Sequence, residues 1–364
     1  MASGHAPELA RVLCIHDNEC AMTDESPTNE QYKRLYEAEV RIKELSPWEW
    51  MNEADVFGVA DPQGEEIGFV SVMGMLGEHY AVSLYPNPEA LYSLLALEEA
   101  GPAVNPDALL EIPQVQLSFE DREELANSEW QVIKELGFKF RGRKAWPMFR
   151  SYRPGYAPWF IEAGEARSLE RALQQLLEVA PRFREDPSLL DPDEDSYLVR
   201  VAHYRDGEIA WEDAAVEVPP PEPEPIQIEM ETATLESLQT LPQAEYELQM
   251  DLFMFPTPVQ ENKDQRPILP YMVLIVEAES GVVMGSEFLT ADPSLQQMWA
   301  SVTPKVADQL LDLEAKPAGV AVSSGLLLQL LQPLAETAGF ELGWSYSMPA
   351  LEEAKQSLFE AFGR

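Results

Sequence analysis

The sequence predicts two domains, an α+β domain followed by an α/β domain in which a three-stranded meander precedes βαβ units. Strand-like and helix-like patterns are mixed in the first part of the chain and alternate in the second. At 364 residues the chain is long enough for more than one core. The run VPPPEPEPIQ at 218–227 marks a semi-rigid linker, because proline removes backbone donors and fixes an extended course. We therefore expect a flexible N-terminus over 1–29, the α+β domain over 30–217, the linker, and the α/β domain over 228–364.

The first domain begins with a helix and continues with short strands. The helix is expected in TNEQYKRLYEAEVRIKEL, whose apolar residues have mostly helical spacing, and it ends before Pro47. Three strand-like runs follow, VFGVADP, EIGFVSVMG and YAVSLYP, separated by a Pro-Gln-Gly turn and by Gly74 and Gly77. The remaining elements are, in order, the helix PEALYSLLALEEA, the strand QVQLSFED, the helix SEWQVIKELGF, a cationic segment, the helix EARSLERALQQLLEVAPRF, and the hairpin DSYLVRVAHYRDGEIAWEDAAVEV with Asp206-Gly207 at its turn.

The second domain has the pattern order β-β-β-α-β-α-β-α. Its elements are the strand YELQMDLFMFP, the hairpin YMVLIVEAESGVVMGSEFLT, a helix at 293–315 interrupted by Pro304, the strand PAGVAVSS, the helix GLLLQLLQPLAETAGF, the strand FELGWSY, and the helix PALEEAKQSLFEAFG. Either Ser323 or Ser324 can cap the helix that follows. Alternation of helices and strands after Leu295 implies parallel strands with right-handed crossovers.

The net charge of −39 limits the classes of partner. Every approach to nucleic acid or to anionic lipid begins with repulsion, so we expect neither direct nucleic-acid binding nor a membrane surface. The sequence has no apolar run near the length of a membrane span and no secretory signal, which favours a cytoplasmic protein. With only Cys14 and Cys20 there is no disulfide framework. No motif calls for a cofactor.

The pattern order over residues 245–362 is similar to the ribonuclease H-like fold of retroviral-type integrases and many transposases. That resemblance implies three or four carboxylates that hold two divalent metal ions. Asp251 in QMDLFMF occupies a place comparable to the first acid, and Glu352 or Glu353 on the last helix is a candidate for the third. The second acid is missing, because Ser323 and its neighbours stand after the fourth strand.

The missing carboxylate predicts that this domain lacks nuclease activity. The domain also has few basic residues, so it lacks the positive charge that binding to a phosphate backbone requires. Plain surface acidity explains Asp251 and Glu353 better than a metal site does.

The first domain also resembles a known family. The segments SPWEWMNEADVFGVADPQGEEIGFVSVMGMLGEHYAVSLY and SFEDREELANSEWQVIKELGFKFRGRKAWPMFRSYRPGYAPWFI are similar to a widespread bacterial family of uncharacterised proteins. Its members pair such a domain with a C-terminal one like that described above. The resemblance brings no known activity.

The segment FKFRGRKAWPMFRSYRPGYAPWF at 138–160 is cationic and aromatic within an acidic chain. It can be a docking loop that stacks rings or holds an anion, with a protein or an anionic small ligand as partner. It can instead be an internal strap whose arginines pair with acids such as Glu120, Asp121 and Glu123, and we favour this alternative. The candidate binding residues are Arg141, Arg143, Trp146, Arg150, Tyr152, Arg153, Tyr156 and Trp159.

Weaker motifs add no site. CIHDNEC offers Cys14, His16 and Cys20, but nothing later in the chain completes a tetrahedral zinc set. His79 has no nucleophile in view, and the glycines around it lack the lysine and hydroxyl of a phosphate loop.

We therefore expect a non-catalytic binding or regulatory protein. One alternative is a divalent-metal-dependent phosphodiesterase related to integrases, acting through Asp251 and Glu353. A second alternative is an acidic decoy of nucleic acid that binds a cationic protein.

Overall fold

The structure is a computed structural model that describes residues 26–62, 66–100, 106–193, 196–205, 208–222, 224–260 and 262–362. The chain forms two units: one comprises Met1–Tyr152 and Pro158–Pro221, and the other comprises Arg153–Ala157 and Glu222–Arg364. The protein is thus a mixed α/β chain of two domains, as expected. Among the described residues no helix is both long and apolar enough to cross a membrane. The expected flexible N-terminus, the CIHDNEC motif and the Asp206-Gly207 turn lie outside the described residues.

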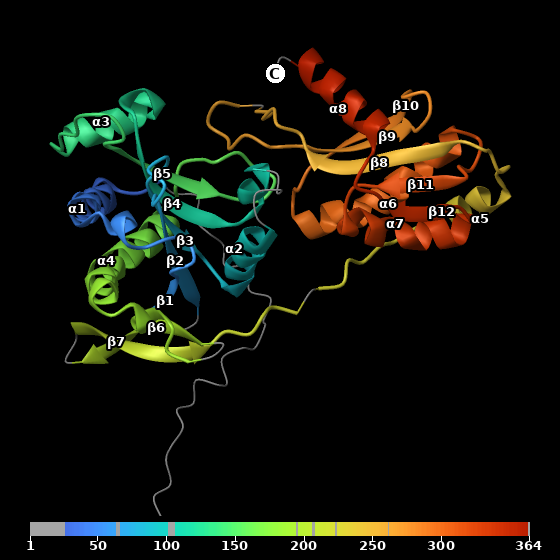
Figure 1. Cartoon of the computed structure of the whole chain (residues 1–364). Helices are drawn as coiled ribbons and strands as arrows, with labels where there is room; N and C mark the ends of the chain where they lie inside the picture. The colour runs from blue at the N-terminus through green and yellow to red at the C-terminus, as the bar shows by residue number, and fades with distance from the viewer. Residues whose placement is uncertain are drawn as a thin grey trace, which may run out of the picture. The chain divides into compact units, whose positions relative to one another are not determined.

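A seven-stranded mixed sheet forms the centre of the first unit (Figure 1). Its order is β5-β4-β3-β2-β1-β6-β7, and the pairs are antiparallel except for the parallel pair of β1 and β6. The strands are β1 Phe57–Ala60, β2 Ile67–Met73, β3 Ala81–Tyr85, β4 Gln114–Glu120, β5 Trp146–Tyr152, β6 Ser196–Arg205 and β7 Glu208–Glu217.

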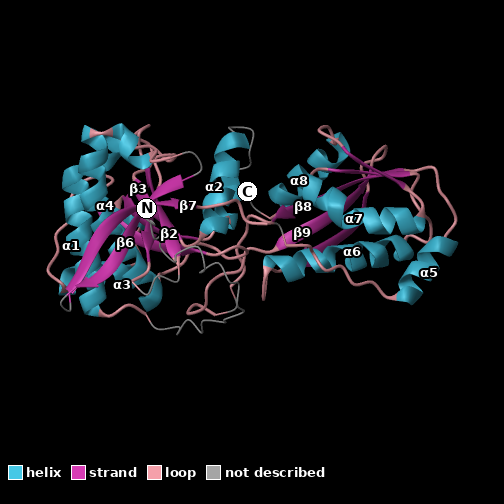
Figure 2. Cartoon of the chain, turned by 90° about the horizontal axis from the view of Figure 1, so that it is seen from below, coloured by secondary structure: helices cyan, strands magenta, loops and turns pink. Residues whose placement is uncertain are grey.

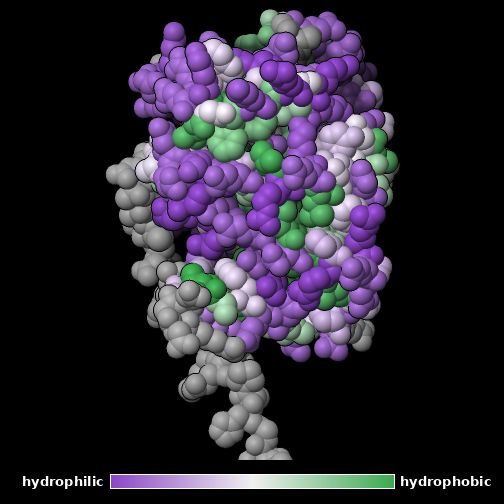
Figure 3. Space-filling view, turned by 90° about the vertical axis from the view of Figure 1, so that its left-hand side faces the viewer, coloured by the Kyte–Doolittle hydropathy of each residue, from purple (hydrophilic) through white to green (hydrophobic). Residues whose placement is uncertain are grey.

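Helices cover both faces of this sheet, as Figures 1 and 2 show. The helices are α1 Asn29–Leu45, α2 Pro88–Ala100, α3 Asn127–Glu135 and α4 Ala163–Glu185, with 3₁₀ turns at Pro47–Glu49, Pro106–Glu111, Arg122–Glu124 and Pro187–Leu190. Successive side chains of β2 point to opposite faces of the sheet, so the strand contributes to two hydrophobic clusters. Val70 and Val72 pack with α1 and α4, and Phe69 packs with α2 on the other face. Hydrophilic residues cover most of the face of this unit that Figure 3 shows.

The second unit has a five-stranded sheet in the order β10-β9-β8-β11-β12. The strands are β8 Glu247–Met254, β9 Tyr271–Glu277, β10 Val283–Leu289, β11 Gly319–Val322 and β12 Glu341–Trp344. The first three form an antiparallel meander, and β8, β11 and β12 run parallel. The helices are α5 Thr232–Thr240, α6 Leu295–Asp312, α7 Gly325–Ala338 and α8 Pro349–Ala361. α8 packs on one face of the sheet, and α6 and α7 lie on the other (Figure 1).

Five residues from the middle of the chain belong to this second unit. Ala157 N–H donates a hydrogen bond to Pro267 O, and Leu269 N–H donates to Gly155 O, both at 2.9 Å. Gly155 has a φ of +78°, and a Cβ at this position would lie 2.3 Å from the Cβ of Ala291. Only glycine fits this close contact without strain.

Three local details differ from the sequence-based expectation. The cationic segment contributes the edge strand β5, which was not expected, and α5 was missed. The expected interruption at Pro304 is wrong, because α6 continues through it. By contrast, the expected cap of α7 is confirmed: Ser324, one of the two candidates, accepts a hydrogen bond from Leu327 N–H.

Glu39 is an unusual core residue of α1. Its side chain is fully buried, and neither carboxylate oxygen has a hydrogen-bond partner. Burial raises the pKa of Glu39 from 4.5 to about 8, although nearby Lys43 opposes the shift. Between these two values the folded chain keeps a proton that the unfolded chain releases, so the free energy of unfolding falls as the pH rises through this window.

We therefore predict that Glu39→Gln stabilises the first unit near neutral pH. The gain in unfolding free energy should be about 1–3 kcal/mol at pH 7 and should vanish near pH 4, where both states are protonated. Urea unfolding at several pH values measures it. Glu37→Gln, an exposed position of the same helix, is the control. A gain that does not depend on pH would contradict the account.

Candidate functional site

The second unit places a carboxylate in the middle of its sheet, on β8. Asp251 is 8% exposed, and Leu274, its partner across the ladder, packs in the cluster beneath α8. Directly paired residues lie on the same face of a sheet, so Asp251 points toward α8.

Two side chains from distant parts of the chain contact this carboxylate. Parallel pairing of Val322 with Met250 brings the next residues, Ser323 and Asp251, together. Ser323 Oγ donates a hydrogen bond to Asp251 Oδ1. Lys355 Nζ donates to Asp251 Oδ2 at 2.6 Å, and it also lies 4.1 Å from the centroid of the Phe253 ring.

Lys355 reaches Asp251 because it shares a face of α8 with buried Leu351. Residues four apart on a helix lie one above the other on the same side. The N–H of Leu351 donates to Gln249 Oε1 at 2.9 Å, which fixes the start of α8 against β8. Glu352 and Glu353, the acids proposed from the sequence, are exposed. The helix therefore presents a cation, and no carboxylate, to Asp251.

The groups around Asp251 do not suit a pair of divalent cations. Such ions require several oxygen ligands, mostly carboxylates, whereas Asp251 contacts one hydroxyl and one ammonium group. Across the described ranges of the chain, no group of three or more His, Cys, Asp or Glu side chains is placed to hold a metal ion. The ammonium group of Lys355 already contacts the carboxylate of Asp251, the group that could serve as a metal ligand at this position.

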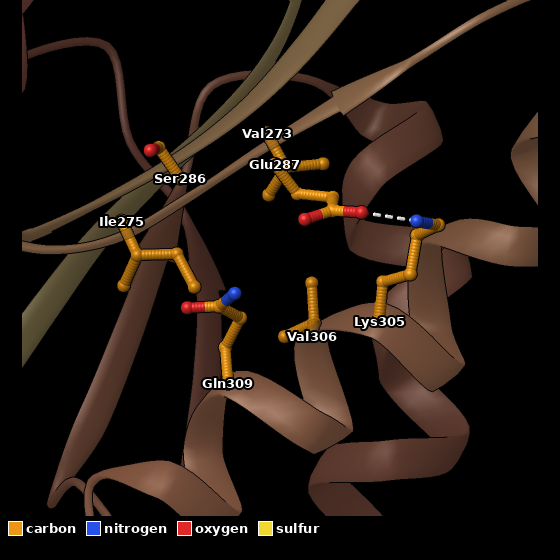
Figure 4. Close-up of a pocket in the computed structure, with 7 residues that line it drawn as sticks. All are labelled: Val273, Ile275, Ser286, Glu287, Lys305, Val306 and Gln309. Carbon is orange, nitrogen blue, oxygen red and sulfur yellow. Dashed lines mark hydrogen bonds and ion pairs between the residues drawn. The ribbon is translucent and has the colours of Figure 1, made fainter.

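Figure 4 shows a second ion pair of this unit, in a crevice between β9, β10 and α6. Lys305 Nζ pairs with Glu287, and the crevice leaves no room for a water molecule. Gly285, which precedes Ser286 of the lining, lies so close to Gln309 that a Cβ would come within 2.4 Å of Gln309 Oε1. The crevice is closed packing and offers no ligand site.

In the first unit, the central arginine of the cationic segment is paired internally. Arg150 lies on β5 and makes two hydrogen bonds to Glu129 of α3, from Nη1 to Oε1 at 2.6 Å and from Nη2 to Oε2 at 3.0 Å. Both side chains are nearly buried, with 13% and 11% exposed. Arg150 also lies over the ring of Phe160 at 5.0 Å. The partner is Glu129, which the sequence did not single out.

The first part of the cationic segment is more open. Arg141 is exposed, and Arg143 lies 3.5 Å from Asp121 with 89% of its side chain exposed. Asp121 also accepts a hydrogen bond from the backbone of Lys144 at 2.7 Å. Trp146 is half-buried and packs on Phe140 in an edge-to-face contact at 6.1 Å.

The proposed binding residues fall in both units of the chain. Tyr152 ends β5, where its hydroxyl donates to Gln116 Oε1 at 3.2 Å, whereas Arg153 and Tyr156 belong to the second unit. Trp159 returns to the first unit and pairs with Ser151 through two backbone hydrogen bonds, at 2.8 and 3.0 Å. The eight residues are therefore divided between the two units of the chain.

Sequence reasoning missed two residues that matter here, Lys355 and Glu129. For Lys355 a signal existed, since helical spacing from Leu351 selects it over Glu352 and Glu353. For Glu129 the signal was a capping position, because its Oε2 accepts from Ala126 N–H at the start of α3. His79 is half-exposed, and its Nδ1 lies 3.7 Å from Oε1 of Glu120. This contact pairs the histidine with an acid and brings it no serine or cysteine nucleophile.

Comparison with family models yields two matches, one in each part of the chain. Residues 32–200 match the family described as "Domain of unknown function (DUF7309)". Residues 234–359 match "Domain of unknown function (DUF6930)". A search of curated proteins found no match. The two matched regions together cover most of the chain, which is consistent with an uncharacterised two-domain family.

Proposed function

We propose that the protein is a non-catalytic binding protein whose second unit is a ribonuclease H-like domain without a metal centre. The strand arrangement supports the fold: an antiparallel meander ends on the central strand β8, and β11 and β12 are added parallel to it on the other side. In this fold the metal-binding acids lie on the first strand, after the fourth strand and on the last helix. The corresponding places here hold Asp251, Ser323 and Lys355.

The observation that carries the proposal is the contact of Lys355 with Asp251 at 2.6 Å. A divalent ion at Asp251 would have to displace an ammonium group, and it would gain only one carboxylate and one hydroxyl in return. The lysine side chain is 26% exposed and that of Asp251 is 11% exposed, so breaking the pair leaves a poorly solvated charge. A cation supplied by the chain thus replaces the metal that cleavage would require.

For the cationic segment we propose the role of internal strap. The paired hydrogen bonds of Arg150 with Glu129 join β5 to α3 and support this role. A charge-assisted bidentate pair at a nearly buried position both orients and neutralises the arginine. The docking alternative retains Arg141 and the exposed Arg143 as its best residues.

We predict that Arg150→Ala destabilises the first unit by about 1–3 kcal/mol, since it leaves Glu129 nearly buried without its cation. Arg143→Ala, at an exposed pair, should change the free energy of unfolding by less than about 0.5 kcal/mol. Urea unfolding of the full chain compares the two. Equal stability of Arg150→Ala and the wild type would contradict the strap and favour docking.

For the second unit, Lys355→Ala should lower the free energy of unfolding by about 1–3 kcal/mol. The matched control is Lys305→Ala, whose pair with Glu287 is more exposed and should contribute less than about 1 kcal/mol. Thermal unfolding of both variants provides the comparison. If both variants lost the same free energy of unfolding, the pair of Lys355 with Asp251 would contribute no more to stability than the more exposed pair, which would contradict the prediction.

Metal binding gives the most direct test of the proposed function. Calorimetry with Mn²⁺ should show no specific site in the wild-type protein. The double variant Ser323→Asp, Lys355→Glu restores carboxylates at the two altered places, and Mn²⁺ should raise its unfolding temperature unless Asp251→Asn is added. Saturable Mn²⁺ binding to the wild type that Asp251→Asn abolishes would overturn the proposal, whether or not the double variant folds.

A further inference from the structure

We propose that a pocket of the first unit binds an organic cation that carries alkylammonium or guanidinium groups. The pocket lies between the segment before β1, the helix α2, the end of α4 and the start of β6. Its volume is about 380 Å³, which falls within the range of small-molecule sites. The inference is independent of the state of the second unit, because every lining residue belongs to the first.

The charge of the lining selects the ligand's sign. Asp55, Asp191 and Asp193 line the pocket, and its described lining residues include no lysine, arginine or histidine. Asp55 Oδ2 accepts hydrogen bonds from the backbone and side-chain nitrogens of Asn52, each at 2.8 Å. These neutral donors orient the carboxylate but leave its charge uncompensated. The pocket therefore concentrates negative potential inside an already acidic protein.

The aromatic walls favour a cation with an organic body over a bare ion. Tyr92, Phe183 and Tyr197 line the pocket together with the carboxylates. The Tyr92 hydroxyl donates to Val218 O at 2.6 Å, and the Tyr197 ring packs edge-to-face on Phe69 at 5.8 Å. Both rings are thus held in place before a ligand arrives. Aromatic rings attract ammonium and guanidinium groups and also cover their alkyl parts.

The spacing of the acids disfavours a metal ion. The described residues contain no cluster of three or more acidic, histidine or cysteine side chains that converge on one point, so the three aspartates do not form one coordination shell. Asp191 and Asp193 are exposed, whereas Asp55 is half-buried. Carboxylates at different depths of one pocket suit a ligand whose positive groups are separated by a chain. A free polyamine and a basic side chain of another protein share this chemistry.

Titration calorimetry of the full chain with two probes tests the proposal, at an ionic strength of about 0.15 M to screen diffuse attraction. The probes are spermidine and a tetralysine peptide. At least one should bind saturably with one site per chain, and Asp191→Asn, Asp193→Asn should weaken it about tenfold or more. Both substituted residues are exposed, so this double variant should fold normally. Asp55→Asn provides an independent variant deeper in the pocket.

The matched control is Glu123→Gln, Glu124→Gln, which removes two exposed charges from another part of the same unit. This control variant should bind the probes as the wild type does. Binding of spermidine alone would identify a free amine as the ligand, and binding of the peptide alone would identify a basic side chain of a partner. Equal weakening in the control, displacement of the probe by equimolar Mg²⁺, or no saturable binding of either probe would overturn the proposal.

Discussion

A carboxylate held beneath a helix in the middle of a sheet requires a positive partner, and in the second unit this requirement ties together three distant parts of the chain. Asp251 lies on the central strand, Ser323 follows β11, and Lys355 lies on α8. Removing water from a carboxylate costs several kcal/mol unless donors or an opposite charge replace it. The contact therefore constrains both the rotation of α8 over the sheet and the register of β11 beside β8. Under the proposed function, it also occupies the position at which a catalytic metal would have to bind.

Charge pairing also occurs in the first unit, where two arginines share one partly exposed acid. Asp213 accepts from Arg182 and from Arg200, and these contacts, with Arg182 the larger, hold the pKa of Asp213 below its ordinary value. Arg200 is itself buried and also donates to Gln175 Oε1 at 3.0 Å. In the folded chain Asp213 stays ionised down to a lower pH than it does in the unfolded chain. Its ion pairs therefore stabilise the fold at neutral pH, and this contribution is lost as the pH falls through the lowered pKa. With 25 basic residues against 64 acidic ones, the chain keeps a net charge of −39 at pH 7.

Much of this architecture could be predicted from the sequence, because it depends on local patterns. The helix PEALYSLLALEEA corresponds residue for residue to α2, and the meander and the parallel strands of the second unit follow the predicted order. The strand β5 could not be predicted in this way, because its arginine, proline and aromatic residues resemble a loop and it lies at the edge of the sheet, where β4 is its neighbouring strand. The contact between Asp251 and Lys355 joins residues 104 positions apart, so helical spacing can select Lys355 as an inward-facing residue of α8 but does not identify Asp251 as its partner. The division of the candidate binding residues between two units likewise has no local signal.

The membership of Arg153–Ala157 in the second unit makes that unit discontinuous along the chain. A fragment that begins after the proline-rich segment would lack the backbone groups that Pro267 and Leu269 use as partners, and it would leave the surface of Ala291 uncovered. Excision of the C-terminal half at its apparent boundary would therefore produce an incomplete fold. By the same reasoning, cleavage of the linker by a protease would not yield two self-sufficient halves, since each half of the chain contributes residues to the second unit.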